Sequence, residues 1–344
     1  MSKHLLSEKL AGFLIKAYDI GPLKSIDSPV SRGNLSRYAI ITTDRGKFFI
    51  KERNPMYNIS HIQFDHELID FLLQHEFNTP RLIPDRNGRK LVTLKRHFFE
   101  LFEYIPGGKY KHGSDPHMRS VARTLARYHR LVENFSTEII KPFQTASYFI
   151  HDQTSWASGP CPFEDIFRRM KKIFGDRYEK IRPLVVRIEA CFRVLQIKMR
   201  YVRSQDLTRL VIHGDYQPRN LLFKNGRVAA VTDFDCATTQ ERMVDVARAL
   251  MGFAMNKSLA HLVIEPSDLD RMRRFLDDYQ ESCPLTRYEM EFLPLLLLST
   301  AIGAVAWWLR YGEPKHVPAA LRVGLPFIYW FEDNQTLIDS VLKG

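Results

Sequence analysis

The chain has 344 residues, of which 45% are hydrophobic and 26% charged, a globular composition with room for one large or two ordinary domains. Its net charge is +11, yet it has no long lysine or arginine block, zinc-ligand spacing or aromatic RNA-binding motif. We therefore expect no specific nucleic-acid partner. Four widely spaced cysteines without a Cys-x-x-Cys motif exclude a disulfide scaffold and favour a reduced, cytoplasmic location.

The first fifty residues predict a helix, a polar loop and two strands. Leucines and lysines mixed over residues 3–16 indicate an amphipathic helix and not a signal peptide, whose apolar region would be uncharged. Residues 38–42 and 47–51 form two strands around a turn at 44–46. Before them lies a loop of small and polar residues whose backbone N–H groups are suited to anions, and its candidate contacts are Ser31, Gly33 and Asn34.

A second helix and a further strand complete this N-terminal region. Apolar residues at helical spacing follow Ser60, a plausible N-cap, and Thr79-Pro80 closes the segment. Residues 98–105 form an apolar strand that ends at Pro106-Gly107-Gly108. Residues 1–105 thus alternate helix and strand.

The rest of the chain, from residue 109, is predicted to be mostly helical, with a helical insert over about 140–205. Residues 292–309 form an uncharged run of eighteen residues, and this length is the lower limit for a membrane span. Pro294, Ser299 and Gly303 interrupt this run, and a buried core helix is the favoured interpretation. We expect no membrane span.

Residues 213–235 carry the most specific pattern: His-Gly-Asp, then Asn220, and then Asp233-Phe234-Asp235. Asn225-Gly226 between apolar runs predicts a hairpin with a type I′ turn. In that register Lys224 pairs with Arg227, Leu222 with Ala229, and Asn220 faces Val231. Asn220 and Asp233 then lie close enough to share a cation.

Oxygen ligands from an amide and a carboxylate suit Mg²⁺, so Asn220 and Asp233 are the candidate metal ligands. The spacing from His213 to Asp215 and from Asp215 to Asn220 is that of the protein kinase catalytic loop. Asp215 is therefore the candidate catalytic residue, with His213 in support. The alternative for a pattern of this kind is a surface hairpin with polar ends.

A kinase reading gives roles to the earlier elements as well. Lys51 ends the second strand, where a kinase keeps its phosphate-binding lysine, although a solvated strand end is the alternative. Glu67 is the best candidate on the following helix to pair with Lys51, and Asp65 and Asp70 compete with it. The segment Glu103, Tyr104 and Ile105 would be the hinge whose backbone holds adenine.

The segment from His213 to Asp235 resembles the aminoglycoside phosphotransferase and choline kinase family, which includes kinase-like homoserine kinases. Two further motifs share this resemblance: Asp245-Val246-Ala247 and the helix motif Leu125-Ala126-Arg127-Tyr128-His129. The resemblance implies an α+β, protein-kinase-like fold with a small antiparallel-sheet N-lobe (1–105) and a larger, mainly helical C-lobe (106–344). It also implies ATP, Mg²⁺ and a small-molecule hydroxyl acceptor. Asp245 would brace the catalytic loop.

The resemblance leaves the acceptor open among homoserine, choline, sugar and aminoglycoside types, and it does not give the oligomeric state. Only eleven residues separate Asp233 from Asp245, which favours a small acceptor over a protein. Asp235 replaces the glycine of the protein kinase motif and is either a second metal ligand or an acceptor contact. A protein kinase and a non-catalytic nucleotide-binding regulator remain as alternatives.

Overall fold

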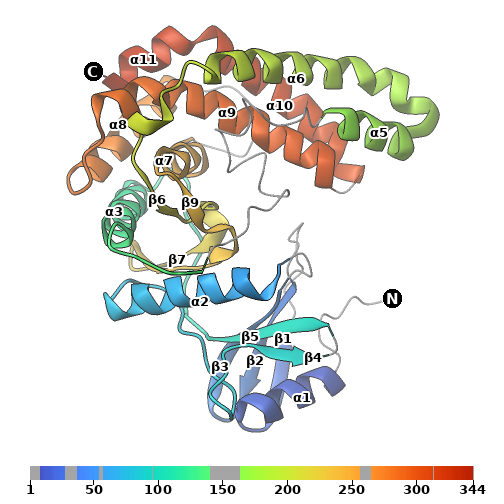
Figure 1. The fold of residues 1–344 in the computed structure, drawn as a ribbon, viewed down its shortest axis with the longest axis vertical. Coiled ribbons are helices and arrows are strands. Elements are labelled where there is room, and N and C mark those ends of the chain that lie inside the picture. The colour runs from blue at the N-terminus through green and yellow to red at the C-terminus, as the bar shows by residue number, and fades with distance from the viewer. Residues whose placement is uncertain are drawn as a thin grey trace.

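The computed structural model describes residues 8–27, 37–53, 57–94, 96–139, 163–255, 265–312 and 314–343. A small part built on an antiparallel sheet lies below a larger, mostly helical part (Figure 1). The predicted α+β class, with the sheet early in the chain and the helices after it, is confirmed.

The sheet holds five antiparallel strands in the order β1-β2-β3-β5-β4. Their bounds are β1 Leu23–Asp27, β2 Arg37–Thr43, β3 Gly46–Glu52, β4 Val92–Leu94 and β5 His97–Glu103. Helix α1, Glu8–Tyr18, packs its apolar side on one face, where Leu14 joins a core with Ile41 and Ile50. Because side chains alternate along a strand, Lys51 points to the opposite face from Ile50.

Helix α2, Ile59–Gln74, belongs by its packing to the larger part of the molecule. Phe64, Leu68 and Leu72 lie in the same core as the later helices. Its N-cap is Asn58, whose side chain accepts a hydrogen bond from the N–H of His61 at 3.0 Å. The prediction of Ser60 as the N-cap was wrong by two residues, since an asparagine upstream makes an equally good cap.

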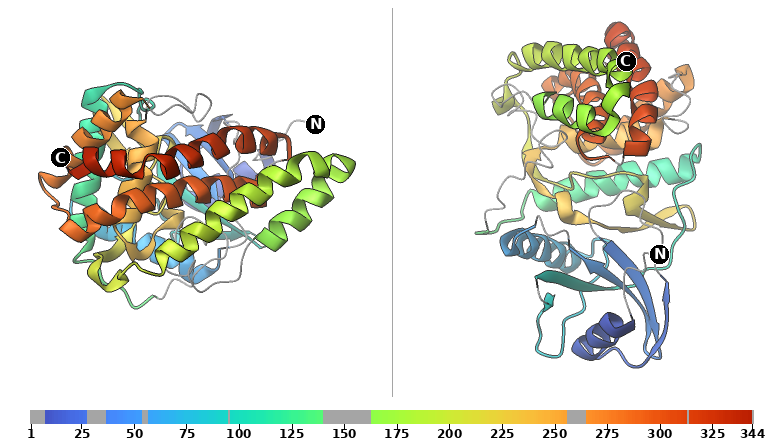
Figure 2. Two further views of the ribbon diagram at one scale, coloured as in Figure 1. Left: turned by 90° about the horizontal axis from the view of Figure 1, so that it is seen from above. Right: turned by 90° about the vertical axis from the view of Figure 1, so that its right-hand side faces the viewer.

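The helical part encloses two short antiparallel pairs of strands. Strand β6, Arg209–Ile212, pairs with β9, Thr238–Glu241, and β7, Leu221–Lys224, pairs with β8, Arg227–Val231. Figure 2 shows the long helices stacked beyond these strands, away from the sheet. The α-helices of this part within the described residues are α3 Asp115–Val132, α5 Phe163–Phe174, α6 Tyr178–Met199, α7 Met243–Ala249, α8 Pro266–Gln280, α9 Arg287–Tyr311, α10 Val317–Asp333 and α11 Gln335–Lys343.

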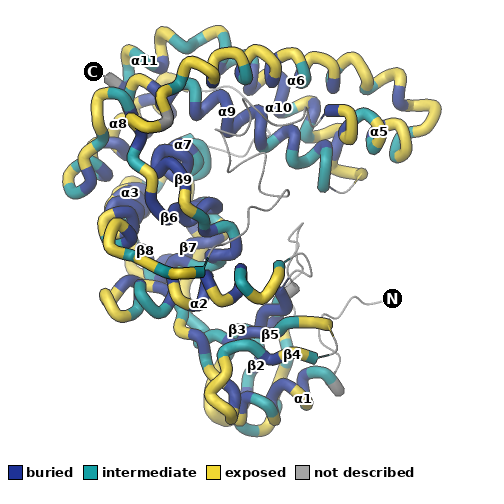
Figure 3. Tube along the Cα trace, in the orientation of Figure 1, coloured by how far each residue is buried: buried dark blue, intermediate teal, exposed yellow. Residues whose placement is uncertain are grey.

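Helix α9 contains the long uncharged run of the sequence. By length and composition it is the one helix of the described ranges that could cross a membrane, but 72% of its most apolar window is buried inside the protein. The tube in Figure 3 is mostly dark blue along this helix. Close packing explains the small residues nearby, since a Cβ on Gly324 of α10 would lie 2.1 Å from Val305 Cγ2. Burial of this kind is typical of a core helix.

A short connector joins the two parts of the molecule. After β5 the chain runs through Pro106 and Gly107 to Gly108, which exchanges two backbone hydrogen bonds with Phe223 of β7, at 2.8 and 2.9 Å. A Cβ on Gly107 would lie 2.9 Å from Leu222 Cβ, so a side chain there would separate connector and strand. The connector is thus fastened to the strand that follows Asn220.

Candidate active site

The hairpin at the centre of the site has the predicted turn. Asn225 and Gly226 have φ values of 51° and 77°, as a type I′ turn requires, and Lys224 pairs with Arg227. Beyond Phe223 the predicted register is wrong by one residue, because a β-bulge makes Leu222 pair with Ala230. Bulges of this kind re-aim the end of a strand, and they have no clear signal in sequence.

The bulge sets Asn220 and Asp233 at neighbouring strand ends. The carbonyl of Asn220 accepts from the N–H of Thr232 at 2.8 Å and from its hydroxyl at 3.0 Å. Asp233 follows directly and has φ 69°, a left-handed conformation that is uncommon outside glycine. Both predicted metal ligands therefore lie together, and strained residues of this kind cluster at functional sites.

Asp245 fixes the loop that carries Asp215. This fully buried carboxylate accepts from the N–H groups of His213 and Gly214, at 2.7 and 2.9 Å, and lies 3.3 Å from Nε2 of His129. Burial alone would raise the pKa of Asp245, but these partners outweigh it and lower the pKa. The bracing position implied by the family resemblance is the one found.

His213 holds the same loop from the other side. Its Nδ1 accepts from the N–H of Asp215 at 3.1 Å, and its Nε2 lies 3.0 Å from the carbonyl of Thr232. The ring therefore ties the catalytic loop to the residue that precedes Asp233. Two loops that are distant in sequence become one unit.

The Asp215 carboxylate is buried and surrounded by donors. Asn220 Nδ2 lies 2.7 Å from its Oδ2, Arg219 also contacts Oδ2 at 2.9 Å, and Arg248 pairs with Oδ1. Burial would raise the pKa of Asp215, but Arg248 and Arg219 more than offset it, so the pKa lies well below its ordinary value. Asp215 is an ionised hydrogen-bond acceptor at neutral pH.

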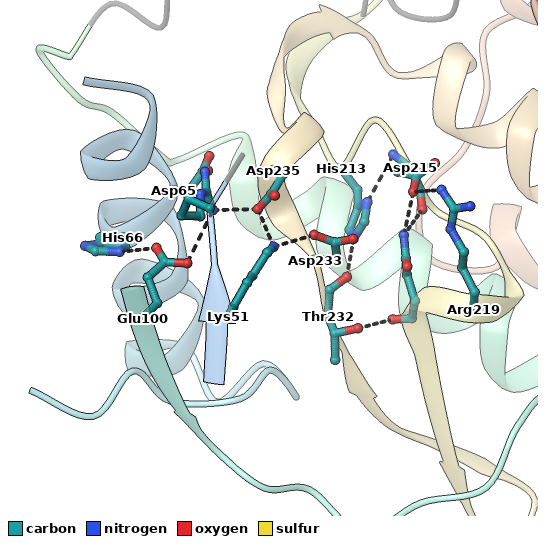
Figure 4. A network of polar contacts seen from close by, with 12 residues as sticks. Lys51, Asp65, His66, Glu100, His213, Asp215, Arg219, Thr232, Asp233 and Asp235 are labelled. Carbon is teal, nitrogen blue, oxygen red and sulfur yellow. Dashed lines mark hydrogen bonds and ion pairs between the residues drawn. The ribbon is translucent and has the colours of Figure 1, made fainter. Parts of the chain in front are cut away.

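Lys51 reaches from the sheet to the hairpin and joins the two parts of the site. Its Nζ lies 2.6 Å from a carboxylate oxygen of Asp233 and 2.6 Å from one of Asp235 (Figure 4). Burial would lower the pKa of Lys51, but the two acids outweigh burial and raise it. The predicted lysine and the predicted metal ligand therefore face each other across the interface.

Arg53 stands beside Lys51 in a second, fully buried ion-pair group. Its guanidinium contacts Asp235, Asp65 and, at 3.6 Å, Glu100. The same oxygen of Asp235 accepts from both Lys51 and Arg53. In this state Asp235 binds the sheet, so its predicted alternatives as a metal ligand or an acceptor contact stay predictions.

The expected pairing of Lys51 with Glu67 was wrong. Glu67 is exposed and accepts a hydrogen bond from the hydroxyl of Thr137, whereas Asp65 faces the sheet and binds Arg53. Residues two apart in a helix differ by about 200° in direction, so both cannot face the sheet. Asp70, the other competitor, pairs with Lys90.

The other nucleotide residues predicted from sequence lie partly outside the structure. Ser31, Gly33 and Asn34 fall outside the described residues. Strand β5 ends at Glu103, whose N–H already donates to the carbonyl of Arg81 at 3.0 Å, so this group is not free for a base. Tyr104 and Ile105 follow without regular structure, at the start of the connector.

The donor set at the hairpin fits one hard cation with few protein ligands. Within the described ranges no three histidine, cysteine or acidic side chains gather as a metal site. Both hydrogen bonds of the Asn220 amide use its nitrogen, so its oxygen points away from Asp215. An amide oxygen and the Asp233 carboxylate match the habit of Mg²⁺, which takes one or two protein oxygens and completes its shell with phosphates and water.

A comparison with protein-family models decides the family. The model described as the phosphotransferase enzyme family matches residues 28–281, which is most of the chain. The chain belongs to this phosphotransferase family. The homoserine kinase of Phenylobacterium zucineum (strain HLK1) is 25% identical over 292 residues, which cover 84% of this chain and 80% of that protein.

Solved structures of other phosphotransferases share the fold. The amicoumacin kinase hAmiN, in complex with AMP-PNP, Ca²⁺ and Ami, superposes with a TM-score of 0.68 at 13% identity, covering 96% of this chain and 94% of that one. A microcompartment-associated aminopropanol kinase gives 0.64 at 14% identity, covering 96% and 98%. The prediction of a kinase-like phosphotransferase that acts on a hydroxyl group is confirmed by the family and these relatives.

Three site residues were missed by sequence reasoning: Arg53, Arg219 and Arg248. Each lies close in sequence to a predicted site residue: Arg53 two residues after Lys51, Arg219 four after Asp215, and Arg248 three after Asp245. Basic residues are common across the whole chain, so these three had no distinguishing signal. Only the fold turns them toward carboxylates.

Proposed function

We propose that this phosphotransferase moves the γ-phosphoryl group of ATP, in the presence of Mg²⁺, to a hydroxyl group of a small molecule. The observation that carries the proposal is the meeting of Asp215 and Asn220 with Asp233 and Lys51 at one place, where the two parts of the molecule face each other. Phosphoryl transfer needs these components: an acceptor-orienting carboxylate, oxygen ligands for a cation, and a positive charge for phosphates.

Each residue has a role that follows from its position. Asp215 accepts a hydrogen bond from the acceptor hydroxyl, orients its oxygen toward phosphorus and takes up its proton as the new bond forms. Asn220 and Asp233 would hold Mg²⁺, which offsets phosphate charge when bound. Lys51 would turn from Asp233 to the phosphates, a short move for a flexible side chain.

Homoserine is the first acceptor to test, because the homoserine kinase relatives cover most of both chains. Aminoglycoside-type antibiotics are the second candidate, on the strength of the fold. A protein acceptor and a purely regulatory nucleotide-binding role are the remaining alternatives. We further propose that residues 1–105 and 106–344 act as the two lobes of the enzyme, and that it works in the cytoplasm.

The test is an ATP-consumption screen over hydroxy amino acids, amino alcohols, hexoses and aminoglycosides, run with wild type and with Asp215→Asn. We expect the variant to lose about 10²- to 10⁴-fold in kcat. Its affinity for ATP with Mg²⁺, measured by calorimetry, should stay within about threefold, because Asn keeps the shape of the side chain. Asp270→Asn, on the exposed face of α8, is the matched control.

Two results would count against the proposal. One is wild-type turnover by Asp215→Asn with the acceptor present, which would remove Asp215 from the mechanism. The other is efficient transfer to a generic protein substrate with none to any small hydroxyl compound, which would favour a protein kinase.

A further inference from the structure

The acceptor side of the site carries more positive than negative charge. Each oxygen of the Asp215 carboxylate is paired with a guanidinium group, Oδ1 with Arg248 and Oδ2 with Arg219. On the nucleotide side, by contrast, Lys51 and Arg53 face four acids: Asp65, Glu100, Asp233 and Asp235. The surplus of cations is therefore local to Asp215.

Arg248 differs from Arg219 in ways that suggest a binding role. Its side chain is 16% exposed against 54% for Arg219, so its charge is screened far less by water. Its Nε is buried and has no hydrogen-bond partner. Arg219 interacts electrostatically with Asp233, the candidate metal ligand, as well as with Asp215. Arg248 thus keeps a donor without a partner beside Asp215.

The backbone around Arg248 is built to hold it in place. A π-helix, Leu250–Ala254, follows α7 directly; such helices are rare and occur often at functional sites. Its last carbonyls are capped by the buried Arg271, which donates to Ala254 at 2.9 Å and to Phe253 at 3.2 Å. A Cβ on Gly252 would lie 3.0 Å from Pro218 Cδ, so the π-helix packs closely on the catalytic loop.

We propose that the acceptor carries an anionic group, a carboxylate or a phosphate, and that Arg248 binds this group while the acceptor hydroxyl lies on Asp215. Oδ1 of Asp215 accepts from Arg248 and from Nε2 of Gln217, and in this proposal the hydroxyl takes the place of Arg248. A largely buried guanidinium that loses its carboxylate needs another anion, and a neutral or cationic acceptor supplies none. This inference rests on the proposed kinase function and specifies its substrate class.

The chemical step is unchanged by the anion. The hydroxyl oxygen forms a bond to the γ-phosphorus, the bond from that phosphorus to the bridging oxygen of ADP breaks, and the hydroxyl proton is accepted at Asp215. The anionic group of the acceptor only fixes its position. Arg248 therefore determines specificity and orients the acceptor.

The test uses acceptors that differ in charge and share a hydroxyl. Homoserine is compared with homoserinol, and glycerate and glycerol 3-phosphate are compared with glycerol; the second set separates carboxylate from phosphate. In each pair the anionic member is the one that carries a carboxylate or phosphate. For wild type we expect kcat/KM to be at least about tenfold higher for the anionic member than for its partner without that group. Arg248→Gln should lower kcat/KM for the anionic member by about 10- to 100-fold, mainly through KM, and should abolish the preference. Arg248→Lys should keep part of it.

Arg123→Gln is the matched control, because Arg123 is a half-exposed residue of α3 that pairs with Asp278 and Glu281. The inference is overturned if wild type prefers neutral or cationic members, or if Arg248→Gln lowers both members of a pair equally, as a merely structural role would. In either case the kinase function stands. If no hydroxyl compound of any charge is phosphorylated while ATP still binds, the proposed function fails, and this inference fails with it.

Discussion

Replacing Asp245 with asparagine tests how the catalytic loop is held. The carboxylate accepts two backbone N–H groups, from His213 and Gly214, inside a site with no exposed surface. An asparagine has one acceptor oxygen, so one N–H stays buried without a partner, at a cost of about 1–3 kcal/mol. The other bond loses its charge, worth about 1 kcal/mol. We expect Asp245→Asn to lower the free energy of unfolding by about 2–4 kcal/mol.

Urea unfolding followed by tryptophan fluorescence measures this change, because Trp307, Trp308 and Trp330 lie on α9 and α10 of the helical part. Turnover should fall with stability, since the loop that loses its anchor carries Asp215. Asp277→Asn, at an exposed position of α8, is the control and should stay within about 0.5 kcal/mol. A loss below about 1 kcal/mol with normal turnover would refute the bracing role of Asp245.

Two further predictions concern the same loop. Gly214→Ala should lower the free energy of unfolding by about 2–5 kcal/mol and remove most of the activity, because φ is 73° and the new Cβ would lie 2.3 Å from the carbonyl oxygen of Cys236. Gly113→Ala, at φ 80° with open space around it, measures the cost of the backbone conformation alone. Equal losses of stability in both variants would show that the contact with Cys236 is unimportant. A separate prediction concerns His129, whose pKa is lowered by burial although Asp245 opposes this. Below about pH 6.5 His129 is therefore protonated in the unfolded chain while it stays neutral in the folded chain. The free energy of unfolding should therefore fall on acidification, by up to about 1.4 kcal/mol per pH unit. The urea midpoints at pH 7.5 and pH 5.5 should differ less for His129→Gln than for wild type. The same pH dependence in both proteins would exclude His129 as the source.

Sequence reasoning succeeded where a local rule acts on adjacent residues. The Asn225-Gly226 turn requires positive φ at two positions, and few residue pairs other than Asn-Gly supply it so readily. The spacing of His213, Asp215 and Asn220 belongs to one loop, so it survives in any fold that contains the loop. The two-part α+β architecture was implied by the family resemblance that this loop carries, and it agrees with the order of the predicted elements.

It failed where partners come from different elements. Asp65 and Glu67 both lie on α2, and only the packing of that helix against the sheet decides which of them faces inward. The bulge in the hairpin shifted the register by one residue, which periodicity alone does not reveal. Arg219 and Arg248 are two basic residues among 50 in the chain, and three-dimensional proximity to Asp215 is what distinguishes them.

The connector between the sheet and the helices limits how the two parts can move. The connector is held at both ends. The N–H of Glu103 donates to the carbonyl of Arg81, and Gly108 pairs with Phe223, so within the connector residues 104–107 are left to rotate. Pro106 fixes one of their torsions, and Gly107 lies against β7 with no room for a side chain. The chain also crosses between the two parts before and after α2, which packs with the helical part. Any movement that separates Lys51 from Asp233 must therefore turn at three short crossings together.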